Sequence, residues 1–548
     1  MNKKENLKFK IFLLGLIILL ASFLRLYKLS FYPAGFNADE AAIGYNVYSL
    51  IQTGRDEHGN FWPIHFKSFG DFKPGGYFYL VLLFVKIFGL TELAVRLPSV
   101  LLGVLSVLLI YLLVFELFQS FSLALFSSFF LAISPWHFHF SRGGWETNAA
   151  TTFILLGFWL FLKGIKNPKL FLFSILSFIF SMYTYHSARV IVPFLLFGLL
   201  IFYRKFLFNQ LKWLFLSGIL GIILLLPLIF SFFSPVAVSR FSGVGFLSDS
   251  GPLWRANELR GEHQNWNAPK IVFLHNKFLN YGLSFLENYF DHFQGEFLFL
   301  SGDEIERNRI PGNGQMYLFD ILFLPLGIYF FLKNKPKNWQ LVFWWLAISP
   351  LASAMTFQTP HAIRAHNMVV PLIIISSYGF YNMLLVLKKI SSKPLFTIYY
   401  LLFTIFIIWN VSYFLHQYFI HYPKVYPAAW EYGMKDLVSF ISPIKDRYLR
   451  IYITDQYDQP YILFLFYLKY PPEKFQKEVI LTPRDKFGFS TVRDFDKFYF
   501  EKIEWAKIKE ERNILVCGTD KEIPNDVKIL KKIDFLNGEP AFKCVEIL

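Results

Sequence analysis

Long apolar runs recur along the chain, the first of about 20 residues, and they limit its fold more than any other sequence feature. The first run follows a start that carries four lysines within ten residues. A run of this length can cross a bilayer as a helix, so the pattern predicts about eleven transmembrane helices. The later runs lie at about 97–118, 120–134, 149–163, 170–185, 189–203, 212–233, 316–332, 339–355, 367–387 and 394–416.

Composition excludes several other classes of protein. With 55% hydrophobic and 20% aromatic residues, the chain is too apolar for a soluble protein of several domains. The net charge of +15 comes from short basic clusters between apolar runs and not from a continuous basic domain, which argues against nucleic acid as a partner. Two cysteines exclude a Cys-rich metal site.

The basic clusters predict the topology. Four short basic loops, at 163–166, 204–212, 333–337 and 388–393, are expected in the cytoplasm together with the N-terminus. The segment 74–90 is short, apolar and interrupted by a lysine, so we interpret it as a juxtamembrane or re-entrant helix. The outer loops are then 30–96, 135–148, 234–315 and 356–366.

After about residue 416 the sequence changes to an ordinary mixture of polar and apolar residues. We therefore divide the chain into a membrane domain at 1–416 and a small soluble α/β domain at 417–548 on the extracytoplasmic side. Strands are expected at 449–454, 479–482, 513–517 and 541–547, and helices at 428–440 and 461–469. Cys517 and Cys544 lie on two of these strands. They could form a disulfide or remain two buried free thiols, and the sequence leaves both alternatives open.

Two adjacent carboxylates, Asp39 and Glu40, follow the first apolar run directly. An acidic pair at the mouth of a membrane helix is a candidate functional site, because a carboxylate there must stay hydrated, bind a cation or accept a proton. The alternative is structural. The pair could open a helix and interact with its dipole without any chemistry.

The other predicted outer loops add charged groups on the same membrane face: Arg142, Glu146, Asp303, Arg307, His361 and Arg364. Arginine and lysine near the bilayer suit a phosphate whose lipid tail stays in the membrane. A carboxylate nearby could deprotonate an acceptor hydroxyl or help to hold a divalent cation. Simple binding of lipid phosphate is the alternative for each arginine.

Short motifs mark the predicted outer loops and the helices beside them. They are Asn37-Ala-Asp-Glu40, Thr53-Gly-Arg-Asp-Glu-His-Gly59, Phe69-Gly-Asp-Phe-Lys-Pro74, Phe88-Gly89, Ala94-Val-Arg-Leu-Pro-Ser99, Ser134-Pro135, Ser141-Arg142 and His361 to Arg364. With these motifs the chain resembles GT-C glycosyltransferases, most of all in the first outer loop. It is most similar to the bacterial branch related to protein O-mannosyltransferases and to the aminoarabinose transferases of lipid A. The resemblance covers about 1–415, and the tail resembles the extra-membrane domains that many members carry.

The resemblance implies roles by position. Asp39 is similar to the catalytic aspartate of the family and Glu40 to its acidic neighbour, while Glu146 is similar to the acid of the second outer loop. The donor phosphate is expected at Lys73, Arg96, Arg142 and Arg364, and further substrate contacts at His361, Asp303 and Arg307. One departure stands out, since Lys73-Pro74-Gly75-Gly76 replaces the usual Lys-Pro-Pro-Leu and predicts a more flexible segment after Lys73. Metal use varies in the superfamily, so a divalent metal is left open.

These features predict a glycosyltransferase in the cell membrane. It would move a sugar from a polyprenyl-phosphate donor to a protein, lipid or glycan acceptor at the extracytoplasmic face. One alternative is a transporter or flippase for lipid-linked sugars, which would show broken helices near the midplane of both halves. Another is a non-catalytic polysaccharide-assembly protein that uses the tail as a binding module.

Overall fold

The structure is a computed structural model that describes residues 3–231, 233, 245, 249–483 and 490–548. Residue 232 of the run 212–233 and most of the first 15 residues of the predicted loop 234–315 therefore lie outside the described residues. The chain forms two compact units. We call them the helical unit (Met1–Leu24, Leu102–Phe140 and Thr147–Phe414) and the sheet unit (Arg25–Leu101, Ser141–Glu146 and Leu415–Leu548).

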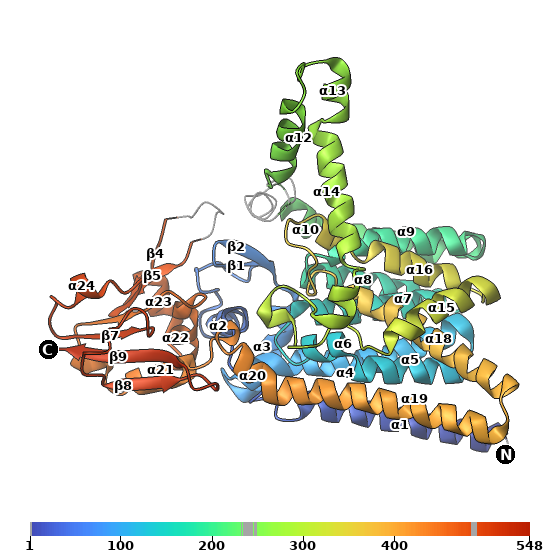
Figure 1. The fold of residues 1–548 in the computed structure, drawn as a ribbon, viewed down its shortest axis with the longest axis horizontal. Helices are drawn as coiled ribbons and strands as arrows, with labels where there is room; N and C mark the ends of the chain where they lie inside the picture. The colour runs from blue at the N-terminus through green and yellow to red at the C-terminus, as the bar shows by residue number, and fades with distance from the viewer. Residues whose placement is uncertain (1–2, 232, 234–244, 246–248, 484–489) are drawn as a thin grey trace. The chain divides into compact units, whose positions relative to one another are not determined.

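The helical unit consists almost entirely of helices, shown from blue to orange in Figure 1. Each apolar run predicted to be a membrane helix is mainly helical, which confirms a polytopic α-helical fold. The helices that lie wholly or mostly in it are α1 (Lys3–Leu26), α4 (Glu92–Phe118, whose start to Leu101 belongs to the sheet unit), α5 (Phe121–Ile133), α6 (Pro135–Phe140), α7 (Glu146–Gly164), α8 (Leu170–Thr184), α9 (Ala188–Leu207), α10 (Leu211–Ser231), α12 (Gly251–Gly261), α13 (Pro269–Leu274), α14 (Lys277–Asp291), α15 (Asp320–Asn334), α16 (Trp339–Ile348), α17 (Leu351–Ala354), α18 (Val369–Ile390) and α19 (Lys393–His416).

Within the described residues, five helical segments are long and apolar enough to cross a membrane. They are Lys8–Leu26, Glu92–Phe118, Ala188–Ser231, His366–Ile390 and Lys393–Val425. The third contains both α9 and α10, joined by the 3-10 turn Phe208–Gln210. The predicted basic loop at 204–212 is thus helical, because no glycine or proline in it interrupts the backbone.

Two glycines allow α15 and α18 to pack closely in the helical unit. A Cβ atom at Gly327 would lie 2.0 Å from the carbonyl oxygen of Ile375, and one at Gly379 would lie 2.1 Å from that of Phe323. Small residues let helix backbones approach each other in this way, and such contacts are a main source of helix association in membranes.

The sheet unit combines the first predicted outer loop with the C-terminal part of the chain. Its N-terminal part contains α2 (Ala38–Thr53), β1 (His65–Ser68), β2 (Asp71–Pro74) and α3 (Gly76–Phe88). α3 is the segment that we interpret as juxtamembrane or re-entrant. The compact units cut across the division at residue 416, so a separately folding domain at 417–548 stays a prediction.

A seven-stranded sheet forms the C-terminal part of this unit, in the order β4-β5-β6-β3-β7-β9-β8. The central strands β6, β3 and β7 are parallel, and the outer pairs are antiparallel. The strands are β3 (Arg450–Ile453), β4 (Ile480–Leu481), β5 (Val492–Phe495), β6 (Phe498–Phe500), β7 (Ile514–Gly518), β8 (Lys531–Asp534) and β9 (Pro540–Ile547). The helices are α20 (Tyr422–Val425), α21 (Met434–Ile441), α22 (Pro460–Leu468), α23 (Pro472–Glu478) and α24 (Trp505–Ile508).

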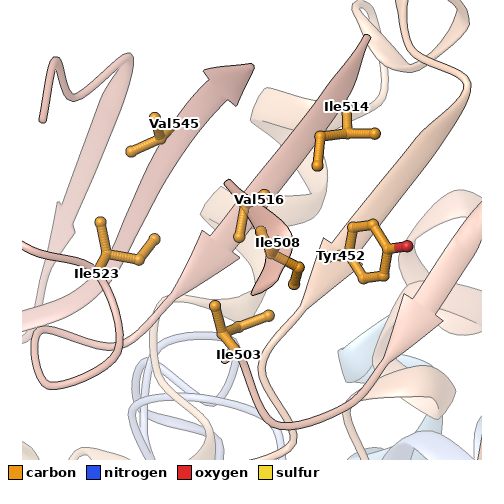
Figure 2. Packing of buried hydrophobic residues seen from close by; sticks show 7 residues of the cluster. All are labelled: Tyr452, Ile503, Ile508, Ile514, Val516, Ile523 and Val545. Atoms are coloured by element: carbon orange, nitrogen blue, oxygen red, sulfur yellow. The ribbon is translucent and has the colours of Figure 1, made fainter. Parts of the chain in front are cut away.

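Figure 2 shows the apolar core on one face of this sheet. Ile514 and Val516 are two residues apart on β7 and therefore point to the same face, where Ile508 of α24 covers them. Cys517 and Cys544 lie opposite each other on β7 and β9 and form a disulfide. Of the two alternatives left open by the sequence, the structure shows the disulfide.

Candidate functional site

Asp39 and Glu40 lie in the first turn of α2, whose start is fixed by its cap. The side chain of Asn37 accepts a hydrogen bond from the backbone N–H of Glu40 at 3.0 Å. Carboxylates in the first turn also interact favourably with the helix dipole. The structural alternative, that the acidic pair opens a helix and interacts with its dipole, therefore describes its position correctly. It does not exclude chemistry, because neighbouring residues on a helix point about 100° apart and the two side chains have different surroundings.

The Asp39 carboxylate accepts a hydrogen bond from the Nζ of Lys73, and the two side chains form an ion pair. The side chain of Asp39 is 30% exposed and that of Lys73 15% exposed. An ion pair at the rim of a folded unit, still in contact with solvent, can exchange its partner for a ligand. These two predicted site residues are thus brought together across 34 positions of sequence.

A short β-hairpin places Lys73 at this position. Phe69 and Gly70 between β1 and β2 both have positive φ angles, 55° and 84°. Two such residues are what a tight hairpin turn requires. The register pairs Lys73 with Phe66, so a slip of one residue would turn the lysine to the opposite face.

Steric contact explains why glycine follows Pro74, where the resembling proteins usually have a second proline. The N–H of Gly75 donates to the carbonyl of Ile64 at 2.8 Å, and a Cβ atom at Gly75 would lie 2.8 Å from that same oxygen. Glycine therefore lets α3 start directly against the hairpin. Lys73 and Pro74 are paired within β2, so the backbone position of Lys73 is set by the hairpin, and the flexibility of the segment after it stays a prediction.

Glu146 is the third predicted catalytic residue near this pair. Burial opposes a charge on Lys73, but the negative charges of Asp39 and Glu146 outweigh it and raise the lysine's pKa. Lys73 is therefore a cation at neutral pH. Asp39, Lys73 and Glu146 form one cluster, which we call the rim cluster.

Glu40 points away from solvent and has several partners. Its carboxylate accepts hydrogen bonds from Nε and Nη2 of Arg96, each at 2.9 Å, and from the backbone N–H of Gly144 at 2.7 Å. Both charged side chains are buried, with 1% or less exposed. Removing one partner of such a pair costs about 3–5 kcal/mol, because the other charge stays buried. Glu40 therefore connects α2, α4 and the loop before Glu146.

The guanidinium groups of Arg96 and Arg142 bind backbone carbonyls. Arg96 donates to the carbonyls of three residues in 29–35 in addition to Glu40. Arg142 donates to Arg25 at 3.0 Å, Tyr27 at 2.7 Å and Tyr32 at 3.1 Å, and it lies over the rings of Tyr418 and Phe419. Both arginines are fully buried. The structure thus gives them partners other than the phosphate predicted from the sequence.

The C-terminal helices of the sheet unit pack directly on α2. A Cβ atom at Gly44 would lie 2.5 Å from the ring of Phe466 in α22, and the hydroxyl of Tyr45 donates to the carbonyl of Tyr470. The side chain of Gln476 in α23 donates to the carbonyl of Asp56. The C-terminal part of the chain therefore holds the helix that carries Asp39.

Sequence reasoning missed Glu57, a buried carboxyl group just beyond α2. Neither carboxyl oxygen has a partner at hydrogen-bond distance among the residues described, and Nε2 of His58 is 3.6 Å from Oε1. Burial raises the pKa of Glu57 to about 8, an effect that the amide of Asn46 and the charges of Lys73 and Lys67 only partly offset. Glu57 is part of the motif Arg55-Asp56-Glu57-His58-Gly59, which was noted only as a resemblance.

In the helical unit, Asp303 joins two predicted outer loops. Its carboxylate accepts from the backbone N–H of Ile305 at 2.9 Å and of Ala362 at 2.6 Å, and Nδ1 of His361 lies 3.7 Å away. The backbone N–H of His361 donates to Nε2 of His292. Burial lowers the pKa of His292 to about 4, so this ring is neutral. These contacts fix the loop at 356–366.

The two predicted arginines of the helical unit have different surroundings. The Nη1 of Arg364 donates to the hydroxyl of Thr356 at 2.7 Å, and its side chain is only partly buried. Arg307 is held through its carbonyl, which lies 2.9 Å from Nε2 of His139. Throughout the described ranges, no group of three or more histidine, cysteine or acidic side chains is arranged to hold a metal ion.

Comparison with known proteins defines the class of fold. Residues 73–230 match the family described as dolichyl-phosphate-mannose-protein mannosyltransferase. No curated protein matches the chain. Among solved structures, ArnT from Cupriavidus metallidurans bound to undecaprenyl phosphate is similar at a TM-score of 0.53 and 11% identity, over 99% of this chain and 98% of ArnT. ArnT in the apo state gives the same TM-score and identity over 97% of both chains.

The oligosaccharyltransferase AglB from Archaeoglobus fulgidus, in complex with an inhibitory peptide and a dolichol-phosphate, is 13% identical at a TM-score of 0.47. That alignment covers 84% of this chain and 63% of AglB. The likeness to ArnT, by contrast, extends over nearly the whole of both chains and shows a shared fold. The chain thus has the GT-C fold with a C-terminal sheet, and it is similar to protein mannosyltransferases and to ArnT.

Proposed function

We propose that this protein is a membrane glycosyltransferase that moves a sugar from a polyprenyl-phosphate donor to an extracytoplasmic acceptor. The observation that carries the proposal is the rim cluster, in which a partly exposed carboxylate and a lysine form an ion pair beside a second acid. Glycosyl transfer needs a base for the acceptor and a cation for the departing phosphate. The GT-C fold and the family match at 73–230 support this class of reaction.

In the proposed reaction, Asp39 acts as the base and Lys73 stabilises the leaving group. The acceptor's hydroxyl or amide attacks the anomeric carbon, and its proton passes to the carboxylate of Asp39. The bond between the anomeric carbon and the phosphate oxygen breaks, and polyprenyl phosphate leaves with the electron pair. Lys73 stabilises the negative charge that develops on this phosphate. Glu146 lies near enough to interact with Lys73, which makes it the alternative base.

The ion pair suggests how the donor prepares the site. Lys73 is bound to Asp39, and a phosphate beside it would compete with that carboxylate for the ammonium group. Binding of the donor would then leave Asp39 freer to accept a proton. Undecaprenyl phosphate, which the ArnT structure contains, is the donor carrier that we propose for the first tests.

Other predicted residues receive a revised role in this proposal. We assign Glu40 and Arg96 to positioning, because they bind each other and the backbone of the loop before Glu146. Arg142 positions the start of the sheet unit through its three carbonyl contacts. Arg364, partly exposed, lies in the helical unit, and its contact with phosphate stays a prediction. His361, Asp303 and Arg307 hold the loops of the helical unit, and their contacts with substrate stay predictions as well.

We also propose the orientation in the membrane. The basic clusters favour a cytoplasmic N-terminus, with the rim cluster and the C-terminal sheet on the extracytoplasmic side. Tags in the segment 388–393 should then be protected from outside the cell, while a tag after Leu548 is reachable. The reverse result would place the rim cluster on the wrong side for this reaction.

The experiment must separate an enzyme from a transporter and from an assembly protein. Purified full-length protein is incubated with several polyprenyl-phosphate sugars and with candidate protein, lipid and glycan acceptors. An enzyme releases free polyprenyl phosphate and attaches the sugar to an acceptor. A transporter moves the lipid-linked sugar but leaves its glycosyl bond intact, and a non-catalytic protein binds it without release. Intact donor under every condition would contradict the proposal.

A further inference from the structure

Helices α12, α13 and α14 of the helical unit expose large apolar side chains. Figure 1 shows these helices in green, extending from the rest of the helical unit crosswise to the long helices α15 and α18. The side chains of Phe278, Phe273 and Trp254 are 78%, 76% and 70% exposed. An exposed apolar surface of this kind in a folded protein marks a binding surface for protein or lipid.

The apolar residues of α14 form a stripe. Leu279, Leu283, Leu286 and Phe290 follow the spacing i, i+4, i+7 and i+11, which places them on one side of the helix. All four are exposed. The rest of the helix surface is partly covered, with Asn280 buried beside the stripe and α12 packed alongside. α14 is thus an amphipathic helix whose apolar side has no cover within the described residues.

Hydrogen bonds anchor the C-terminal end of α14 to the bundle, and their position indicates how deep α14 lies in the membrane. The hydroxyl of Tyr289 donates to the carbonyl of Ala347 at 2.8 Å, and the amide of Asn288 donates to the carbonyls of Ala354 and Thr356. These carbonyls lie in and after α16 and α17, an apolar segment that starts beside the charged residues 333–337. From Trp339 to Ala354 this segment rises roughly 24 Å at 1.5 Å per residue, most of the hydrocarbon thickness of a bilayer. α14 therefore leaves the bundle near the boundary between lipid and water.

The charges of this segment indicate the kind of surface it fits. Residues 251–291 carry four basic side chains, Arg255, Arg260, Lys270 and Lys277, and four acidic ones, Glu258, Glu262, Glu287 and Asp291. The formal charges cancel, so attraction to anionic lipid is not the driving force. Trp254 and Trp266, both exposed, are residues typical of the membrane interface.

We infer that α12–α14 form a lipid-binding element that lies in the interface of the bilayer, with the stripe of α14 in contact with acyl chains. Burial of apolar surface drives this contact, as for other amphipathic helices at membrane surfaces. The inference concerns membrane contact and is independent of the chemistry at the rim cluster. Its occupant is the bilayer for which the segment Ala188–Ser231, with α9 and α10, is a candidate span.

The test measures where a spin label at Leu283 lies in the full-length protein. The two cysteines form a disulfide, so an introduced thiol can be labelled selectively. Leu283→Cys is compared with Ile222→Cys, on the exposed face of the candidate span that contains α10, and with Asp446→Cys, whose side chain is 82% exposed in the sheet unit. Each variant is placed in lipid nanodiscs that hold one chain each.

The accessibility of the label to oxygen and to a water-soluble nickel complex gives its depth. We expect the label at Leu283 to favour oxygen, as at Ile222, in discs of zwitterionic lipid alone. A label as accessible to nickel as that at Asp446 would overturn the inference. Shielding that occurs only in dense proteoliposomes would indicate a second copy of the chain, and shielding that requires anionic lipid would indicate electrostatic binding; either result also overturns it.

Discussion

Lys73 and Asp39 form an ion pair that joins the second strand of a hairpin to the first turn of α2. The pair is partly exposed, whereas the neighbouring pair of Arg96 and Glu40 is buried. Adjacent acids on one helix thus have separate roles in our account. Glu40 holds the structure together, and Asp39 reacts.

Lys73→Ala should weaken donor binding. A charge-assisted contact to phosphate contributes about 1.5–3 kcal/mol, which corresponds to about a 10–150-fold loss of affinity. Lys67→Ala is the matched control, because Lys67 lies on β1 of the same hairpin and its register partner is Phe72. Binding of polyprenyl-phosphate sugar to both variants is measured directly. Equal affinity for the two would remove Lys73 from the phosphate site.

Gly144→Ala should reduce turnover through Glu40. The added Cβ would lie 3.0 Å from Val95 Cγ1 and 3.3 Å from Glu40 Cγ, so the side chain of Glu40, that of Val95 or the loop before Glu146 must shift slightly. We expect kcat to fall about tenfold or more, since small displacements of catalytic groups are costly. In the control Gly282→Ala, nothing lies within 4 Å of the new atom. Normal turnover by a stable Gly144→Ala protein would speak against the positioning role.

Glu57 should make the stability of the protein depend on pH. Its pKa is about 8 in the folded protein and 4.5 in an ordinary environment, so the folded state binds more protons between these values. The free energy of unfolding therefore falls as pH rises from about 4.5 to 8 and levels off above that. Glu57→Gln removes this dependence. The melting temperature of the wild type should fall relative to that of Glu57→Gln as pH rises from 5 to 9, and parallel curves would refute the assignment.

The disulfide should stabilise the C-terminal sheet. It closes a loop with a sequence separation of 27 residues, for which the chain-entropy relation gives about 3–4 kcal/mol. Replacing both Cys517 and Cys544 with serine should lower the unfolding midpoint measured without reductant. With reductant present, the wild type should approach the variant. An unchanged midpoint would mean that the bond contributes nothing to stability.

The sequence predicts the helical architecture well, because apolar runs and caps are local signals. It also identifies Asp39, Lys73 and Glu146 as candidates. Their convergence depends on the β1–β2 hairpin, which was not predicted although Phe69-Gly70 lies between two alternating stretches. That turn was a usable signal, since a glycine between alternating residues is typical of a hairpin.

Other features have no local signal. The roles of Arg96 and Arg142 follow from carbonyls that are more than 60 and more than 100 residues away in sequence. A buried arginine and a phosphate-binding arginine look the same in sequence, since both are cations near the membrane. Likewise, the packing of Phe466 on Gly44 joins segments more than 400 residues apart. Such contacts are set by tertiary structure alone.

In the proposed reaction, Asp39 accepts the acceptor's proton. Asp39→Asn keeps the shape of the side chain but removes the basic oxygen, and loss of a general base lowers the rate by about 10²–10⁴. The decisive measurement is the rate at which purified wild type and Asp39→Asn release free polyprenyl phosphate from a donor that both bind. We expect a fall of that size with donor binding largely retained. Near-equal rates would show that Asp39 is not the base and would make Glu146 the next residue to test.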